Sequence, residues 1–427
     1  MSTRSNPVSC QGGPARIDQG SMMRLPYCTS SNSMGHWSVM SVEMEPSGIV
    51  DHEAKRSVED IARSVRQDER IEALVPGFDA PFFQAGLAGY SDGAMRLVAR
   101  RNGCPFCITE ALLDITLLNG GKGRTREDPD LLAEECGLGD PHENRLAGFD
   151  DHPIAGQVMG TEPEQMARAA SMLAGMNYDV IDVNLACPVK KIRRRKRGGH
   201  FLLAPEEAIE VLAAVRDAVP SEIPVTVKLR RGFDEGPELE EAFYRIFEGA
   251  YDLGCAWTTV HCRTVAQKYK GPGRWAFLKQ LVERYPDRLI FGSGDIWNVE
   301  DIFLMLEVTG VHAVSVARGC IGNPWIFQQA RQLMAGERPA SPTLDQQRRT
   351  LLDHFDLVIA LHGERGGARM MRKFGIKFST HHPDPEPVRR EFITVSTIED
   401  WRRVVDTYYG ESVNPGSNDG PRHADPE

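Results

Sequence analysis

The chain has 427 residues, of which 41% are hydrophobic and 26% are charged, a composition that is ordinary for a globular protein. Its formal net charge of −10 argues against a protein that coats nucleic acid with a generally basic surface, but it leaves room for a local basic face. No apolar run reaches the roughly 18 residues that a membrane span needs, and the first residues lead into no apolar segment. We therefore expect a cytoplasmic protein without a membrane anchor or secretory signal.

The two ends of the chain differ from its middle. Residues 1–75 are rich in Ser, Gly, Met and charge, and we interpret them as an N-terminal extension that is largely disordered over 1–48, with a helix after that. Residues 413–427 are polar and rich in Pro and Gly, which is typical of a disordered tail. Residues 120–151 are charged and rich in Gly and Asp, which predicts a long loop.

Eight short apolar runs predict strands over residues 76–335, and helical patterns separate most of them. The predicted strands are Ala80–Ala85, Phe106–Thr109, Ile154–Met159, Val180–Asn184, Val225–Leu229, Trp257–His261, Leu289–Gly292 and Ala313–Ala317. The predicted helices between them are Glu162–Gly175, Pro205–Ala218, Pro237–Leu253 and Val299–Thr309. This alternation predicts a (β/α)8 barrel, an α/β fold. The alternative is a doubly wound open sheet, which is disfavoured because no GxGxxG follows the first strand.

The pattern becomes helical after the predicted barrel. Periodic apolar positions predict helices over Leu344–Leu361, Gly367–Phe378 and Ile398–Tyr409. We therefore expect a small helical C-terminal domain over residues 336–412.

The nine cysteines are scattered and odd in number, so we expect reduced thiols rather than a disulfide framework. Two of them, Cys104 and Cys107, form a CxxC at the start of a predicted strand. Such a pair can bind a metal or act in redox chemistry. Because no second pair or nearby histidine completes a metal site, we favour a structural role and expect no metal.

Polar residues stand at the carboxyl ends of several predicted strands, which in a barrel form the active-site face. Gln157 ends the third strand, Asn184 the fourth, Lys228 the fifth and His261 the sixth, and Cys187 lies three residues after Asn184. Each of these residues alone would usually be an ordinary solvated side chain. Their common register with the strands predicts a site instead.

Gly-rich turns follow the seventh and eighth strands, at Gly292–Asp295 and Arg318–Gly319. Glycine lets backbone N–H groups approach an anion closely, and barrels commonly hold phosphate at this place. Arg318 could add a charge-assisted contact. The alternative is a pair of ordinary tight turns.

A series of short motifs resembles a known family. The motifs are Ala85–Asp92, Gln157–Gly160, Asp182–Pro188, Pro224–Arg230, Val260–Thr264, Gly294–Ile296, Ala317–Gly319 and Gly322–Phe327. Each motif is weak alone, but together their order and spacing resemble the tRNA-dihydrouridine synthase family over roughly Phe78 to Phe327.

The resemblance implies an FMN enzyme that reduces the C5–C6 double bond of uridine in tRNA, with NADPH as the reductant. We expect a monomer. It implies that a hydride reaches C6 and that Cys187 protonates C5; a free thiol is largely protonated at neutral pH and can serve as such an acid. The residues that the resemblance assigns to FMN are Gly86, Leu87, Ala88, Gln157, Lys228, His261, Ser293, Gly294, Asp295, Ala317 and Arg318.

A tRNA substrate needs a surface that contacts RNA, because the target base must leave its stack to reach the flavin. The run Lys190–Arg197 carries seven positive charges in eight residues and directly follows Pro188. Such a patch suits phosphate contacts, although a charge run is usually just a solvated loop. The residues that we assign to the substrate are Asn184, Lys190, Lys191, Arg193, Arg194 and Arg195.

Two other functions stay open at this stage. One is an FMN oxidoreductase for a small molecule such as a dihydropyrimidine or an enone, and the other is an RNA-binding protein that kept only the barrel. Gly86, Ala186, Ser293 and Ala317 stand where the family usually has proline, glycine, asparagine and glycine, which could mark an altered substrate. The retained Cys187, Lys228 and His261 argue against a non-enzymatic barrel.

Overall fold

The computed structural model describes residues 56–119 and 151–410. The predicted disorder of 1–48 and 413–427 and nearly all of the predicted 120–151 loop lie outside the described residues.

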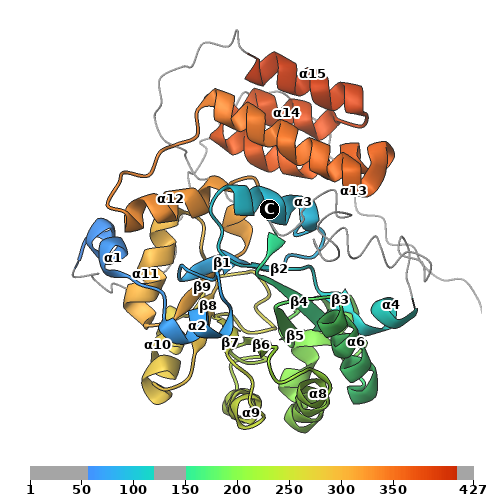
Figure 1. The fold of residues 1–427 in the computed structure, drawn as a ribbon, viewed down its shortest axis with the longest axis vertical. Helices are drawn as coiled ribbons and strands as arrows, with labels where there is room; N and C mark the ends of the chain where they lie inside the picture. Colours follow the sequence, from blue (N-terminus) through green and yellow to red (C-terminus); the bar gives the residue numbers. More distant parts are fainter. Residues whose placement is uncertain (1–55, 120–150, 411–427) are drawn as a thin grey trace, which may run out of the picture. The chain divides into compact units, whose positions relative to one another are not determined.

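Eight parallel strands form a closed barrel (Figure 1). They are β1 (Phe82–Gln84), β2 (Cys107–Ile108), β4 (Ile154–Met159), β5 (Val180–Asn184), β6 (Val225–Arg230), β7 (Thr258–His261), β8 (Ile290–Ser293) and β9 (Ala313–Val316). Each strand pairs with the next in this order, and β9 pairs back with β1. The predicted (β/α)8 barrel is confirmed, and closure by β9 and β1 excludes the open sheet.

The second barrel strand contains a bulge. The short β3 (Leu112–Leu113) continues the path of β2, and both pair with β4. From Ile108 to Leu112 this path advances four residues, whereas β4 advances three, from Ala155 to Val158. One extra residue must therefore bulge out, a feature that is common at barrel rims. Near the bulge, the side-chain oxygen Oγ1 of Thr109 accepts the backbone N–H of Gln157 in β4 at 3.0 Å.

Helices cover the outside of the barrel (Figure 1). They are α3 (Gly93–Arg101), α4 (Asp114–Asn119), α6 (Pro163–Gly175), α8 (Pro205–Ala218), α9 (Pro237–Asp252), α10 (Trp275–Arg284), α11 (Val299–Thr309) and α12 (Trp325–Met334). The four predicted helices correspond to α6, α8, α9 and α11. The helix α3, of which seven of nine residues are buried, was not among the predicted helices.

Aromatic side chains fill the amino-terminal end of the barrel. Phe83 of β1, Phe291 of β8 and Trp257, just before β7, are fully buried, and Phe291 lies 5.7 Å from Phe83 and 4.9 Å from Trp257 between ring centroids. Two short helices precede β1, α1 (Val58–Ser64) and α2 (Glu69–Leu74), and Ile71 of α2 belongs to the same cluster. Because this end is packed with apolar groups, polar chemistry is confined to the opposite end.

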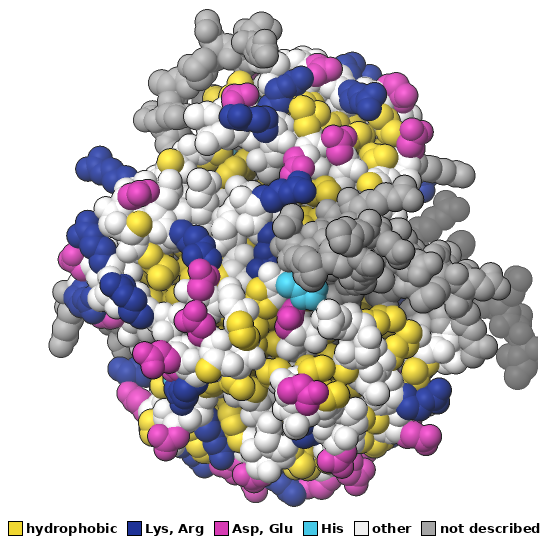
Figure 2. Space-filling view, in the orientation of Figure 1, with side chains coloured by type: hydrophobic (Ala, Val, Ile, Leu, Met, Phe, Trp, Pro, Cys, Tyr) yellow, Lys and Arg dark blue, Asp and Glu magenta, His cyan; other side chains and the backbone are white. Residues whose placement is uncertain are grey.

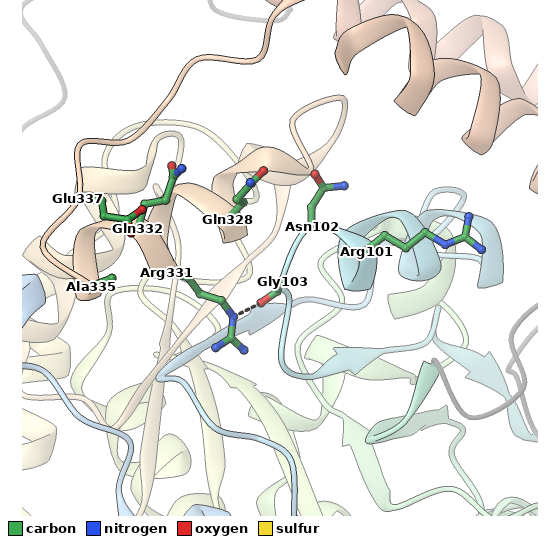
Figure 3. Close-up of a pocket in the computed structure, with 8 residues that line it drawn as sticks. All are labelled: Arg101, Asn102, Gly103, Gln328, Arg331, Gln332, Ala335 and Glu337. Carbon is green, nitrogen blue, oxygen red and sulfur yellow. Dashed lines mark hydrogen bonds between the residues drawn. The ribbon is translucent and has the colours of Figure 1, made fainter. Parts of the chain in front are cut away.

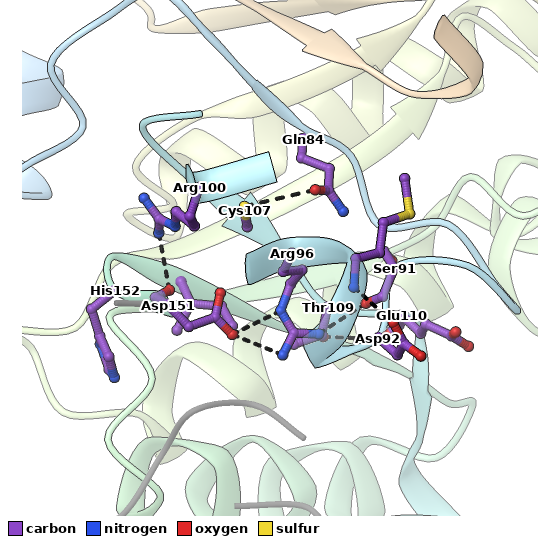
Figure 4. A network of polar contacts seen from close by, with 12 residues as sticks. Gln84, Ser91, Asp92, Arg96, Arg100, Cys107, Thr109, Glu110, Asp151 and His152 are labelled. Atoms are coloured by element: carbon purple, nitrogen blue, oxygen red, sulfur yellow. Dashed lines mark hydrogen bonds and ion pairs between the residues drawn. The ribbon is translucent and has the colours of Figure 1, made fainter. Parts of the chain in front are cut away.

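A buried ion pair fastens α3 to the start of β4 (Figure 4). Arg96 Nη2 lies 2.9 Å from Asp151 Oδ2, and both side chains are almost completely buried. Arg96 Nη1 also donates to the carbonyl of Ser91 at 2.8 Å. Arg100 donates to the carbonyl of Asp151 at 3.0 Å. Two guanidinium groups thus tie the turn after β1 to the chain that enters β4.

The C-terminal segment is helical, as predicted. It contains α13 (Leu344–Phe378), α14 (Pro385–Thr394) and α15 (Ile398–Tyr409). Gly363, at φ 66°, breaks α13 between the two helices that were predicted there. His362 Nε2 lies 2.8 Å from the buried carboxylate of Asp92, which joins α13 to the turn after β1. Within 56–119 and 151–410, no helix has the length and apolar character to cross a membrane.

Truncating a side chain of the aromatic cluster should strongly destabilise the protein. Phe291→Ala should lower the free energy of unfolding by about 3–5 kcal/mol, because it leaves a cavity between rings that cannot collapse. The control Ile393→Ala, at a side chain in α14 that is 48% exposed, should cost less than about 1 kcal/mol. Urea denaturation measures both, and equal losses would contradict the packing described.

Candidate active site

A layer of hydrogen-bonded polar side chains lies above the aromatic cluster. Gln157 of β4 donates through Nε2 to Asp182 Oδ2 of β5 at 2.7 Å. Thr226 of β6 donates to the other carboxylate oxygen, Oδ1, at 2.7 Å. Asn184 Nδ2 donates to Gln157 Oε1 at 2.7 Å. All four side chains are buried, so each has its partners fixed by its neighbours rather than by solvent.

The loop after β5 carries Cys187, and three contacts hold it. Asn184 Oδ1 accepts the backbone N–H groups of both Ala186 and Cys187, at 3.0 and 3.1 Å. Arg230 Nε donates to the carbonyl of Ala186 at 2.9 Å, and the N–H of Gly199 donates to the carbonyl of Cys187 at 3.0 Å. The side chain of Cys187 is half-buried, and this burial raises the pKa of its thiol.

The Lys228 ammonium has no hydrogen-bond acceptor within the described part of the chain, although the residue is only partly exposed. Burial lowers the pKa of Lys228 to about 8, and the nearby carboxylate of Asp182 opposes this effect. A cation at this place is a donor for an anion or a carbonyl that enters the barrel mouth.

His261 sits in a strongly positive field. Burial and the charges of Arg230, Lys228, Arg263 and Arg318 all lower its pKa, well below the usual range for histidine. Its Nδ1 accepts the backbone N–H of Arg263 at 3.2 Å. The imidazole is therefore neutral at physiological pH and carries its proton on Nε2, which makes that atom a hydrogen-bond donor.

The turn after β8 carries the carboxylate of Asp295, which lies close to two guanidinium groups. Asp295 accepts from Arg263 Nη2 at 2.5 Å and from the N–H of Gly273 at 2.6 Å, and Arg318 lies 3.8 Å away. A Cβ on Gly294, at φ 120°, would meet Cys262 Sγ at 2.5 Å, so only glycine fits there. One carboxylate facing two guanidinium groups leaves this turn with net positive charge.

The other predicted phosphate residues lie beside this turn. Ser293 is buried at the end of β8, and its carbonyl accepts the N–H of Cys262 at 3.0 Å. Ala317 precedes a short 3-10 turn that begins at Arg318, and the Arg318 guanidinium lies 4.2 Å from the centre of the Trp297 ring.

The predicted flavin segment Gly86–Ala88 follows β1 directly. A Cβ on Gly86 would lie 2.3 Å from the carbonyl oxygen of Thr109 and 3.4 Å from Gln157 Oε1. The N–H of Leu87 donates to Ser91 Oγ at 2.7 Å. The structure thus brings the predicted Gly86, Gln157, Asn184, Cys187, Lys228, His261 and Asp295 to the carboxyl ends of the strands.

The basic run is not a uniform solvated loop. Its first residues form a short helix, α7 (Lys190–Arg193). The exposed cations are Lys190, Lys191, Arg194, Arg195 and Lys196. Arg193 is half-buried with its guanidinium 5.2 Å from the centre of the Phe233 ring, and Arg197 is buried against Asp114. Arg197 is therefore unavailable to RNA, whereas five cations of the run face solvent.

Two cations of the site were missed in the sequence. Arg230 and Arg263 each stand two residues after a predicted site residue, Lys228 and His261. Side chains two apart in a strand share a face, so period-two spacing could have revealed Arg230 at the end of β6. Arg263 lies beyond the end of β7, where this periodicity no longer applies.

The CxxC pair lies in the protein interior. Cys104 and Cys107 are buried, and their sulfur atoms are 3.8 Å apart. In the described ranges, no group of three or more His, Cys, Asp or Glu side chains is arranged to hold a metal ion.

A surface hollow of about 330 Å³ lies away from these residues (Figure 3). Arg331 Nε donates to the carbonyl of Gly103 at 2.6 Å, and Arg331 Nη2 lies 2.6 Å from Asp79 Oδ1. Arg101, on its rim, pairs with Asp353. Both guanidinium groups are occupied, and none of the predicted site residues lines the hollow.

Comparison with known proteins identifies the family. The model of the family described as dihydrouridine synthase (Dus) matches residues 84–411, from β1 to beyond α15. A probable tRNA-dihydrouridine synthase of Mycobacterium leprae is 33% identical over 278 residues, covering 64% of this chain and 71% of that protein. The tRNA-dihydrouridine synthase B of Xanthomonas campestris is 32% identical over 326 residues, covering 76% and 91%. The chain therefore belongs to the dihydrouridine synthase family.

Proposed function

We propose that the protein is a tRNA-dihydrouridine synthase that reduces the C5–C6 double bond of uridine in tRNA, with FMN as its flavin and NADPH as its reductant. Family membership supports the reaction. The observation that carries the assignment to this site is the half-buried thiol of Cys187 beside a cluster of cations around His261. Both lie at the carboxyl ends of the barrel strands, where enzymes of this fold place their chemistry.

The residues at the barrel mouth fit a flavin mononucleotide. Lys228 lacks an acceptor among the described residues, and so does the buried Nη1 of Arg263. Cations outnumber carboxylates at the turn after β8, which suits the phosphate group. We assign the phosphate to Ser293, Gly294, Ala317 and Arg318, with Asp295 holding Arg263 rather than the ligand. Gly86, Leu87, Ala88 and Gln157 would line the ring.

The proposed chemistry divides between cofactor and protein. When bound at the barrel mouth and reduced by NADPH, FMN would supply the hydride for C6 of the uracil ring. The Cys187 thiol gives its proton to C5, and its raised pKa keeps it protonated at neutral pH. The Lys228 ammonium stabilises negative charge at the ring edge of the cofactor. The neutral His261 donates a hydrogen bond through Nε2 without adding a further charge.

Asn184 has a different proposed role from the one expected. Its carboxamide is occupied by Gln157 and by the two loop N–H groups, so we propose that it positions Cys187 rather than contacts the substrate.

The exposed cations of the basic run, rather than a generally basic surface, support a local contact with RNA. Basic and acidic side chains are interspersed over that face (Figure 2). Five cations between Lys190 and Lys196 are exposed on the segment that follows Cys187. We propose that Lys190, Lys191, Arg194 and Arg195 contact tRNA phosphates, with a smaller contribution from the half-buried Arg193.

The role of Cys187 predicts a selective loss of turnover. Cys187→Ala should retain FMN but form dihydrouridine on unmodified tRNA about 10²–10⁴-fold more slowly than the native protein. Cys255→Ala, at a buried thiol just before β7, should keep native turnover. The part of the rate decline that comes from ionisation of the thiol should set in only above the pH at which an ordinary thiol ionises, because the Cys187 pKa is raised. Full activity of Cys187→Ala refutes its role, and colourless protein that FMN cannot reconstitute refutes the flavin.

Lys228 predicts how FMN affinity depends on pH. The ammonium is charged below its pKa of about 8, so the affinity of the apoprotein for FMN should fall as the pH rises through that value. At pH 7, Lys228→Met should bind FMN roughly 10- to 100-fold more weakly, the loss expected for a hydrogen bond to a charged group. Lys228→Arg should keep its charge and show a flatter profile. Quenching of FMN fluorescence measures the affinity, and the same profile in all three proteins would contradict the assignment.

The exposed cations predict a change in salt dependence. Replacing Lys191, Arg194 and Arg195 with serine should lower tRNA affinity and reduce the slope of log affinity against log salt concentration by roughly 2–3. Lys279→Ser, which removes an exposed charge from α10, should leave the slope unchanged. Filter binding over a salt series tests this, and a native slope in the triple variant would exclude this surface as a tRNA contact.

A further inference from the structure

The last cation of the basic run is buried, unlike its neighbours. The side chain of Arg197 is 9% exposed and that of its partner Asp114 is 1% exposed. Arg197 Nη2 donates to Asp114 Oδ1 at 3.2 Å. This burial removes Arg197 from any surface that could meet RNA, so its charge must serve a contact inside the protein.

Asp114 is fixed to the barrel wall. It directly follows β3, which pairs with β4, and it is the first residue of α4. Its Oδ1 also accepts the N–H of Ile115 at 2.7 Å. A Cβ on Gly160, just after β4, would lie 2.1 Å from Asp114 Oδ2, so the carboxylate occupies space that only glycine leaves free.

Arg197 is joined directly to the segment that covers Cys187. A Cβ on Gly198, at φ 57°, would lie 2.8 Å from Cys187 Cβ and 3.1 Å from its nitrogen. The N–H of Gly199 donates to the carbonyl of Cys187 at 3.0 Å. The two residues after Arg197 therefore pack against Cys187, whose N–H is held by Asn184.

We propose that Asp114 and Arg197 are positioning residues whose buried ion pair holds the Gly198–Gly199 segment against Cys187 and so fixes the place of its thiol. The inference rests on the proposed role of Cys187 as the proton donor. Asp114 Oδ2 and Arg197 Nε and Nη1 have no partner among the described residues. A buried pair with so few hydrogen bonds adds little net stability, but it does fix one geometry.

The proposal is tested by separating turnover from the exposure of the thiol. In Arg197→Gln, kcat should fall on the order of 10- to 100-fold, as expected for a misplaced reacting group, while KM for tRNA and FMN content stay near native. Alkylation of Cys187 by iodoacetamide, measured on the Cys187 peptide by mass spectrometry, should become faster. The pH midpoint of the alkylation rate should move down toward that of a free thiol. Arg197→Lys keeps the charge, so it should restore both kcat and the rate of Cys187 alkylation toward native.

Two further variants make the result decisive. Arg195→Gln removes the same charge from an exposed neighbour, so it should raise KM for tRNA and leave alkylation unchanged. Asp114→Asn/Arg197→Gln leaves no unpaired buried charge, so it should fold even if the single variant does not, and it should still alkylate faster than native protein. Native alkylation in both Arg197→Gln and the double variant overturns the proposal, as does a loss of kcat without faster alkylation. If native protein made no dihydrouridine, the proposed function would fail, whereas the alkylation rates would still decide the positioning role.

Discussion

The carboxamide of Asn184 connects the barrel interior with the loop that carries Cys187, and the rest of the site depends on its orientation. Asp182 accepts from Thr226 and from Gln157 Nε2, which turns Gln157 Oε1 toward Asn184. Asn184 must then present Nδ2 to Gln157 and Oδ1 to the N–H groups of the loop. A carboxylate that accepts through both oxygens thus sets the direction of every hydrogen bond up to Cys187. The thiol is located by the barrel, not by the loop alone.

Strand positions could be predicted because the strands of a parallel barrel are buried on both sides and read as short apolar runs. Gln157, Lys228 and His261 could be predicted as neighbours because strand carboxyl ends meet at one face. The burial of Arg197 could not be predicted, since its partner Asp114 lies 83 residues earlier and no local pattern connects them. The bulge between β2 and β3 was hidden for a similar reason: only pairing with β4 reveals the extra residue.

Departures from the family pattern become easier to understand in this setting. At Gly86, even a Cβ would come within 2.3 Å of the Thr109 carbonyl, so the usual proline would not fit the present path of the chain. Thr109 is also the residue next to the bulge, where it accepts the N–H of Gln157 through Oγ1. The glycine at position 86 therefore suits the local path of the second strand beside the bulge. We infer that this difference adjusts packing beside the proposed flavin site rather than removing a functional group.

The proposed site must reconcile two opposing electrostatic demands. An anionic cofactor needs cations, yet nearby cations favour the thiolate and would remove the proton that Cys187 is proposed to donate. Arg230 does lower the Cys187 pKa, but burial raises it by more, and the net shift is upward. Arg230 also donates to the carbonyls of Ala186, Thr264 and Lys268, so its guanidinium is held by backbone groups. Gly198 and Gly199 cover Cys187 and so maintain its burial. This contact therefore fixes the position of the thiol and also keeps it protonated within a positively charged site.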